Sequence, residues 1–183
     1  MFSVLLPVYN HRPYLVEAVM SAVRDPLVTE IVAADDGSTD GSAELLQRLV
    51  AAFAPKLRNL TLEPARNLGA HATLNRLAEA APNDWLAVLN SDDAFPPGRF
   101  ALVEQALRRA PFDFAFGNIE VIDGAGRPLG IKRAALDPEY PFPGEFDVAG
   151  MLARGEFLDL LSNQNWIATT SNLVFRKDLW RRA

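Results

Sequence analysis

Short apolar runs alternate with amphipathic stretches along the first 110 residues of the chain. The apolar runs are nearly continuous, which predicts buried β-strands over residues 2–8, 29–34, 57–63 and 84–89. The stretches between them place apolar side chains at helical spacing and predict helices over residues 14–24, 43–53, 70–81 and 96–109. This alternation is typical of an α/β fold with a doubly wound, mostly parallel sheet and helices on both faces.

The pattern changes after residue 111. Residues 112–122 alternate partly, residues 123–126 carry a turn signal, and residues 127–132 can return as a hairpin partner, which predicts a small antiparallel extension. Residues 134–146 are dense in Pro and Gly and predict a long loop, and such loops are often lids or binding loops. Residues 172–176 have strand character, and residues 177–182 have the character of the first turns of a helix.

A chain of 183 residues fits one domain of ordinary size. Its net charge of −5 argues against a nucleic-acid partner, because a nucleic-acid-binding surface needs an excess of Lys and Arg. The absence of cysteine excludes disulfides, thiolate metal sites and Cys nucleophiles.

The apolar start, residues 2–8, is too short to span a membrane and lacks the features of a secretory signal. We therefore expect a soluble, cytoplasmic protein without a transmembrane segment.

Polar clusters follow all four predicted parallel strands, at residues 7–10, 35–40, 66–69 and 90–93. In such a sheet, ligands bind beyond the carboxyl ends of the strands, where the loops and the N-termini of the helices converge. The clusters would bring up to five aspartates and an arginine to one rim, and clustered carboxylates repel one another unless cations or hydrogen bonds compensate. Asp92 and Asp93 offer hard oxygen ligands to Mg²⁺ or Mn²⁺, and a diphosphate could complete the coordination shell.

Each cluster also has a purely structural interpretation. Residues 35–38 and residues 90–93 contain the residue types that dominate turns and helix caps. Residues 36–41 approach a calcium-binding loop, with oxygen-bearing side chains at alternate positions, but Gln47 stands where such a loop needs a bidentate Glu. The two histidines, His11 and His71, have no Cys or clustered His partners, which argues against zinc. The sequence also lacks the motifs of serine hydrolases, dinucleotide oxidoreductases and P-loop hydrolases.

Taken together, the polar clusters resemble those of the inverting family 2 of glycosyltransferases, which has the GT-A fold. The resemblance covers roughly the first 110 residues, and residues 171–176 are similar to a later strand of that family. The residues that carry it are Pro7-Val8-Tyr9-Asn10, Asp35-Asp36-Gly37-Ser38-Thr39-Asp40, Arg66-Asn67-Leu68-Gly69 with Asn75, and Leu89-Asn90-Ser91-Asp92-Asp93 with Pro97.

The resemblance implies a binding site for a nucleoside diphosphate sugar, a UDP-sugar above all, with Mg²⁺ or Mn²⁺ as cofactor. Asp36 would accept from the imide of the base, and Asp92 and Asp93 would hold the metal. The donor-binding residues it implies are Pro7, Val8, Tyr9, Asn10, Asp36, Arg66, Gly69, Asn90 and Asp92. It also implies a single domain, 1–183, with a nucleotide-binding half at 1–110 and an acceptor-side half at 111–183 that is truncated at its C-terminus.

The sequence departs from the family pattern in two respects. Asn90 replaces the first carboxylate of the commonest Asp-Ser-Asp-Asp motif, which predicts weaker metal binding. The catalytic base of the family lies in a Glu-Asp-type motif that cannot be placed before Ala183. We therefore expect residues 1–183 to bind donor and metal but to transfer sugar poorly, within a longer native chain that has further domains.

By the same resemblance, the acceptor would be a carbohydrate or a lipid-linked carbohydrate, and the protein would act in polysaccharide biosynthesis, in the cytoplasm or peripherally at the inner face of the membrane. Two other hypotheses stay open. One is a noncatalytic GT-A-like module of a larger protein. The other is a nucleotidyltransferase, although residues 7–10 lack the Gly-rich basic loop expected to cradle a triphosphate.

Overall fold

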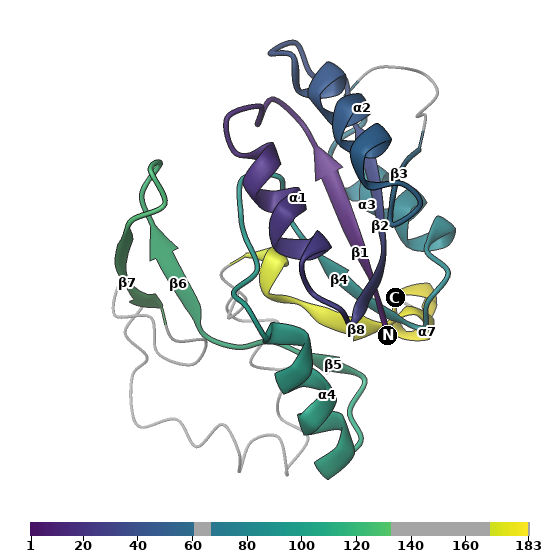
Figure 1. Ribbon diagram of the computed structural model, residues 1–183. Helices are drawn as coiled ribbons and strands as arrows, with labels where there is room; N and C mark the ends of the chain where they lie inside the picture. Colours follow the sequence, from purple (N-terminus) through teal and green to yellow (C-terminus); the bar gives the residue numbers. More distant parts are fainter. Residues whose placement is uncertain (61–66, 133–168, 183) are drawn as a thin grey trace, which may run out of the picture. The chain divides into compact units, whose positions relative to one another are not determined.

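The computed structural model describes residues 1–60, 67–132 and 169–182 (Figure 1). The chain divides into two compact units. One is Met1–Ala115 with Leu173–Ala183, and the other is Phe116–Asn172. Within the described ranges, no helix is both long enough and apolar enough to cross a membrane.

The larger unit is built on a six-stranded sheet in the order β3-β2-β1-β4-β8-β5. Strands β3, β2, β1 and β4 are parallel, whereas β8 pairs antiparallel with both β4 and β5. The strands are β1 (Phe2–Val8), β2 (Val28–Asp35), β3 (Leu57–Asn59), β4 (Trp85–Val88), β5 (Phe114–Ala115) and β8 (Val174–Arg176). The predicted α/β fold with a mostly parallel sheet is confirmed. The strand predicted within residues 172–176 is present at Val174–Arg176, whereas Asn172 ends a 3₁₀ helix. The position of β8 between β4 and β5 was not predicted.

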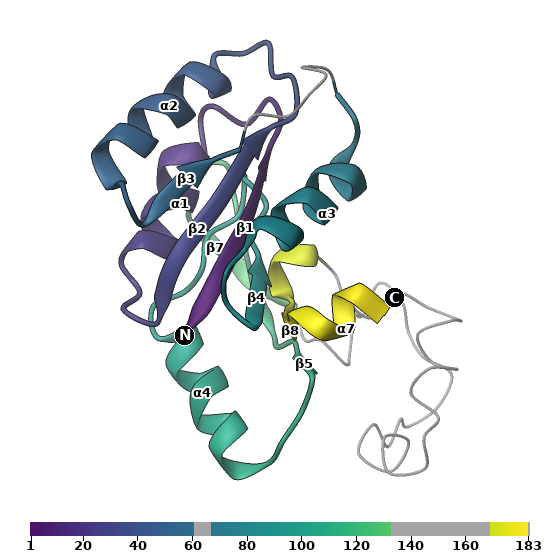
Figure 2. The same cartoon turned by 90° about the vertical axis from the view of Figure 1, so that its right-hand side faces the viewer.

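Helices cover both faces of this sheet, α1 and α2 on one side and α3 and α7 on the other (Figure 2). They are α1 (Leu15–Val23), α2 (Ser42–Phe53), α3 (Ala70–Ala80), α4 (Arg99–Arg109) and α7 (Lys177–Arg182). Strand β1 shows why two cores form, because successive side chains of a strand point to opposite faces. Val4 and Leu6 join the core that contains α1, α2 and Phe100 of α4, whereas Leu5 joins the core that contains α3 and Phe175.

Three element boundaries differ from the predicted ones. Helix α1 begins at Leu15 and ends at Val23, with Tyr14 as its N-cap, and the Tyr14 side chain makes no capping hydrogen bond. The tandem prolines lie in the loop before α4, which begins at Arg99 after Gly98 in the left-handed conformation. Strand β3 ends at Asn59, and the rest of the predicted third strand, residues 61–63, lies outside the described residues.

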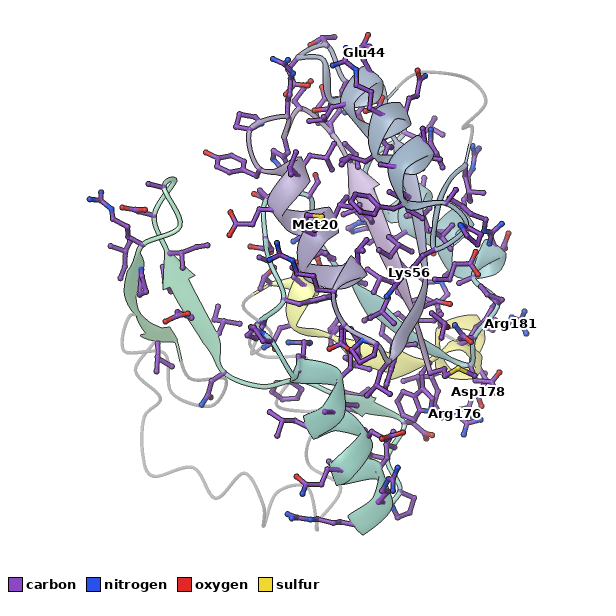
Figure 3. All side chains as sticks on the ribbon, in the orientation of Figure 1. Met20, Glu44, Lys56, Arg176, Asp178 and Arg181 are labelled. Carbon is purple, nitrogen blue, oxygen red and sulfur yellow. The ribbon has the colours of Figure 1, made fainter. Side chains whose placement is uncertain are left out.

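Two lysines from distant parts of the sequence satisfy the C-terminal carbonyls of α1 and α3, whose own last turns contain no basic residue. Lys56 (labelled in Figure 3) donates from Nζ to the carbonyl oxygens of Val23 at 2.7 Å and of Asp25 at 2.8 Å. Lys177 donates to the carbonyl oxygens of Glu79 and Ala81. Burial lowers the pKa of both lysines.

The smaller unit contains the hairpin of β6 (Ile119–Ile122) and β7 (Pro128–Lys132) and the short 3₁₀ helix Thr170–Asn172. The predicted antiparallel extension is therefore present. Asn172 is buried and pairs with the backbone of Gly117, accepting from its N–H at 2.9 Å and donating to its carbonyl oxygen at 2.6 Å. The predicted loop at residues 134–146 lies outside the described residues.

Phe100 provides a test of the packing. Its side chain is completely buried, with its ring centroid 4.8 Å from that of Phe2 and 5.2 Å from that of Phe95. We expect Phe100→Ala to lower the free energy of unfolding by about 3–5 kcal/mol, because it leaves a cavity beside the rings of Phe2 and Phe95. Leu102, on the same helix, is 68% exposed, and Leu102→Ala should change that energy by no more than about 0.5 kcal/mol. Urea denaturation of both variants makes the comparison, and equal losses would contradict the assigned packing.

Candidate functional site at the carboxyl ends of the parallel strands

Three polar loops meet where the adjacent parallel strands β2, β1 and β4 end. They are residues 9–14 after β1, residues 36–41 after β2 and residues 89–98 after β4. Hydrogen bonds join the first loop to each of the other two. The predicted convergence of polar strand ends is therefore present for these three loops.

The loop after β1 is held by side-chain oxygens of the loop after β2. Three consecutive backbone N–H groups donate to them: Asn10 N to Ser38 Oγ at 2.9 Å, His11 N to Ser42 Oγ at 3.1 Å and Arg12 N to Asp40 Oδ2 at 3.0 Å. In return, Thr39 N donates to Asn10 Oδ1 at 2.8 Å. The side-chain oxygens at alternate positions of this loop thus accept hydrogen bonds from backbone amides. These hydrogen bonds hold Asn10 in the left-handed conformation, with a φ of 55°.

Asp40 is the most heavily bonded member of this network. Its Oδ1 accepts from the hydroxyl of Ser42 at 2.6 Å and from Ser42 N at 3.0 Å, while Oδ2 accepts from Arg12 N. The Ser42 hydroxyl and then the Arg12 amide lower the pKa of Asp40. Asp40 therefore stabilises the loop as a carboxylate.

The two carboxylates at the end of β2 are also bonded to backbone amides. Asp35 Oδ2 accepts from the N–H groups of Gly37 at 3.1 Å and Ser38 at 2.9 Å, so the turn interpretation holds for Asp35. Asp36 is only 4% exposed, and its two oxygens accept from Leu68 N at 2.8 Å and Gly69 N at 2.9 Å. Asp36 thereby fixes the turn before α3, and each of its oxygens keeps a second lone pair for a ligand.

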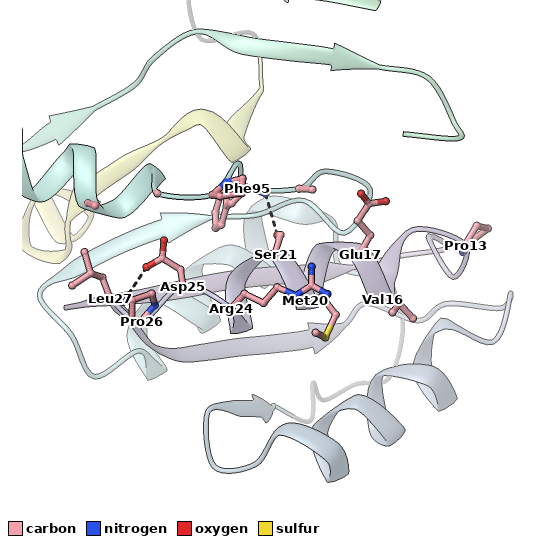
Figure 4. Close-up of a pocket in the computed structure, with 14 residues that line it drawn as sticks. Pro13, Val16, Glu17, Met20, Ser21, Arg24, Asp25, Pro26, Leu27 and Phe95 are labelled. Carbon is pink, nitrogen blue, oxygen red and sulfur yellow. Dashed lines mark hydrogen bonds between the residues drawn. The ribbon is translucent and has the colours of Figure 1, made fainter. Parts of the chain in front are cut away.

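The loop after β4 leaves its carboxylates more open. Asp93 N donates to the Asn90 carbonyl at 3.0 Å, and Asn90 Nδ2 donates to Asp93 Oδ2 at 3.3 Å. The Asp92 side chain is 45% exposed. Farther along, Phe95 N donates to Ser21 Oγ of α1 at 3.0 Å, which ties the loop to the helix (Figure 4).

The remaining predicted donor residues lie as follows. Pro7 and Val8 end β1, with Val8 fully buried, and Tyr9 directly after them is 44% exposed. The backbone of Gly69 lies against Asp36. Arg66 lies outside the described residues.

Hard oxygen ligands are available for a divalent cation at the end of β4. Asp92 and Asp93 are adjacent and at least partly exposed, and Mg²⁺ is commonly bound by one or two carboxylates together with substrate phosphates. Among the described residues, no three His, Cys, Asp or Glu side chains are close enough to hold a metal by themselves. The residues present fit a cation that takes some of its ligands from the protein and the others from a diphosphate.

A groove of about 790 Å³ runs along the outer face of α1 (Figure 4). Its lining includes Val16 and Met20 of α1 and Phe95 and Pro97 of the loop after β4. No residue predicted to bind donor or metal lines this groove, although Pro13 and Ala94, which do line it, belong to two of the rim loops.

The sequence matches the model of Glycosyl transferase family 2 over residues 3–181. The chain belongs to glycosyltransferase family 2. It is 31% identical over 149 residues to the succinoglycan biosynthesis protein ExoU of Rhizobium meliloti, a match that covers 81% of this chain and 41% of ExoU. The predicted family is thus confirmed.

Two solved structures share the fold of this family 2 chain. S. aureus TarS 1–349 in complex with UDP-GlcNAc has a TM-score of 0.68 at 20% identity, over 99% of this chain and 46% of TarS. The mannosyltransferase PcManGT of Pyrobaculum calidifontis, in complex with GDP-Man and Mn²⁺, has a TM-score of 0.52 at 22% identity, over 68% of this chain and 37% of PcManGT. The likeness confirms the predicted GT-A-type fold. The chain spans less than half the length of each of these relatives.

Sequence reasoning missed one pair of residues at the rim of this glycosyltransferase domain. His11 Nδ1 lies 2.9 Å from Ser91 Oγ and 3.6 Å from Asp92 Oδ1. The partners are 80 positions apart, and neither residue type by itself indicates such a contact. The oxygens of Ser38 and Asp40 did leave a signal, their alternate spacing within residues 36–41, but that spacing resembled a calcium loop and did not indicate that they accept from backbone amides.

The Asp40 network predicts a pH dependence. The pKa of Asp40 is lowered in the folded state from its ordinary value of 3.8, so its stabilisation is present above pH 3.8 and is lost as the pH falls through the lower folded value. Asp40→Asn should therefore lower the melting temperature at pH 7, and its difference from wild type should shrink below pH 3.8. Thermal denaturation between pH 3 and pH 7, with the exposed Asp84→Asn as control, measures this. A difference that stays constant with pH would contradict the assignment.

Proposed function

We propose that this chain binds a nucleoside diphosphate sugar together with a divalent cation, as the donor-binding part of an inverting glycosyltransferase. The observation that carries the proposal is the division among the aspartates at the rim. Asp35, Asp36 and Asp40 are bonded to backbone amides, whereas Asp92 accepts no hydrogen bond from any described residue. The three bonded aspartates hold the loops in place, and the Asp92 carboxylate is available to a ligand.

The nucleoside would lie against the end of β1 and the loop after β2. Tyr9 is exposed there and offers an aromatic surface, and Asp36 would accept from the imide of the base with its remaining lone pairs. Pro7, Val8, Asn10, Arg66, Gly69 and Asn90 complete the proposed donor site. The TarS complex with UDP-GlcNAc favours a UDP-sugar, although the GDP-Man complex of PcManGT shows that the fold also accommodates another base.

Asp92 and Asp93 would hold Mg²⁺ or Mn²⁺ between the protein and the diphosphate. When bound, the cation supplies Lewis-acid stabilisation to the departing diphosphate. The chain itself orients the two carboxylates, through the β4 loop and its ties to Asn90 and to α1. The Mn²⁺ in the PcManGT complex supports a cation of this class.

In the whole protein we propose sugar transfer to an acceptor hydroxyl with inversion. A carbohydrate or lipid-linked acceptor is supported by the relationship to ExoU, which is named for succinoglycan biosynthesis. We propose that the protein acts in the cytoplasm, free or peripheral at the inner face of the membrane. The base that would deprotonate the acceptor hydroxyl is not assigned to any described residue.

Calorimetric titration tests the donor site directly. The wild type, titrated with a panel of nucleoside diphosphates and their sugars, should bind at least one of them in a Mn²⁺-dependent manner, and Asp93→Ala should weaken that binding at least about tenfold. Asp84→Ala is the matched control, because it removes the same charge just before the opposite end of β4. Binding by no member of the panel would reject the donor site and support a noncatalytic module. Equal effects of Asp93→Ala and Asp84→Ala would reject the assigned metal position.

Asn90 gives a second test of the metal site. Asn90→Asp adds a carboxylate beside Asp93 and removes the amide that donates to it. We expect Mn²⁺ affinity to rise by roughly tenfold, because ligand charge sets the affinity of hard-cation sites. In metal-free buffer the melting temperature should fall through carboxylate repulsion. The melting temperature with and without Mn²⁺ reports both effects, and a variant whose response to Mn²⁺ equals that of wild type would exclude Asn90 from the site.

A further inference from the structure

His11 links the two outer loops of the rim. Its backbone N–H donates at 3.1 Å to the Oγ of Ser42, the first residue of α2, directly after the β2 loop. Its ring Nδ1 lies 2.9 Å from Ser91 Oγ and 3.6 Å from Asp92 Oδ1, both in the loop after β4. One residue therefore spans the end of β1 from one neighbouring loop to the other.

Asp92 has fewer polar partners than the other aspartates of the rim. Asp35, Asp36 and Asp40 each accept two or more hydrogen bonds from their neighbours. In the part of the chain that the structure describes, the His11 ring is the only polar partner of the Asp92 carboxylate. Without the ring, this half-exposed side chain would be free to change rotamer.

Ser91 determines where the ring points. Its side chain is 2% exposed, so its hydroxyl has little freedom to leave the ring for water. The tautomer with its proton on Nδ1 donates to Ser91 Oγ and presents the polar N–H edge of the ring to Asp92. A buried hydroxyl thus orients the imidazole, and the imidazole orients the exposed carboxylate.

We infer that His11 is a positioning residue that holds the Asp92 carboxylate in the orientation in which it meets the donor and its cation. The inference rests on the proposed function of Asp92 and extends it to a residue that touches neither ligand. His11 acts through Asp92 and not as a metal ligand itself. Groups that orient a ligating carboxylate in this way typically change metal affinity about 10–100-fold when they are removed.

Binding measurements on histidine variants test the inference. His11→Ala removes the ring, His11→Asn keeps an amide nitrogen close to the position of Nδ1, and His71→Ala removes the only other histidine, which is exposed on α3. Each variant is titrated with the Mn²⁺-nucleotide that the wild type binds best, and its melting temperature is recorded. We expect His11→Ala to raise the Kd at least about tenfold, His11→Asn to restore it to within about threefold, and His71→Ala to leave it unchanged.

The outcomes separate a positioning role from a structural one. A melting temperature that falls equally in His11→Ala and His11→Asn while only His11→Ala loses affinity supports positioning, because stability alone cannot explain the difference. Ser91→Ala is a second probe that keeps both the ring and Asp92, and it should weaken binding by less than His11→Ala does. If His11→Ala binds like His71→Ala, or His11→Asn binds as weakly as His11→Ala, the inference is wrong. A wild type that binds no Mn²⁺-nucleotide would overturn the proposed function, and the role of His11 with it.

Discussion

The burial of strand β1 is the constraint on which the rest of the larger unit depends. β1 pairs with β2 on one side and β4 on the other, and its alternate side chains enter two separate cores. The chain therefore leaves the sheet at Val8 from the middle of the rim, between two neighbouring loops. The backbone amides of residues 10–12 have no strand partner there, and hydrogen bonds to side chains fix the path of the chain. The oxygens of Ser38, Asp40 and Ser42 accept these hydrogen bonds.

This arrangement explains how several aspartates can share one rim. Backbone N–H groups carry partial positive charge, and hydrogen bonds from them offset the repulsion between neighbouring carboxylates. Asp35, Asp36 and Asp40 are bonded in this way, so the loops after β1 and β2 and the turn before α3 are ordered by the protein itself. Asp92 differs from these three, because it is half-exposed and, among the described residues, His11 is its one polar partner. A rim that is ordered in advance can bind a ligand without first losing conformational entropy.

Long-range polar contacts recur at the ends of the secondary-structure elements. At the end of α1, the Val23 carbonyl oxygen accepts from Lys56, which lies 33 positions later. At the end of α3, the Ala81 carbonyl oxygen accepts from Lys177, which lies 96 positions later. Strand β8, which precedes Lys177 directly, lies beside β4 and brings that lysine to α3. The C-terminal segment therefore completes both the sheet and a helix end of a unit whose other elements all come from the first 115 residues.

The periodicity of the chain was sufficient to predict the alternation of buried strands and helices, because side-chain spacing reports on burial within a few residues. The polar clusters at residues 7–10, 35–40 and 90–93 were sufficient to indicate a ligand-binding rim and a family, because parallel strands end at one edge of a sheet. The residues chosen for donor and metal stay predictions, and Arg66 lies outside the described residues.

The hydrogen-bond partner of each polar group could not be predicted from the sequence. The alternate oxygens within residues 36–41 only approach the spacing of a calcium loop. The packing of β1 against β2 brings the amides of residues 10–12 within reach of Ser38, Asp40 and Ser42. The same is true of His11, which meets Ser91 and Asp92 across 80 residues. By itself the sequence determined which elements form and where polar residues gather, since both depend on local spacing. The tertiary structure decided which carboxylates are bonded and which stay open, since that depends on partners that only folding brings together.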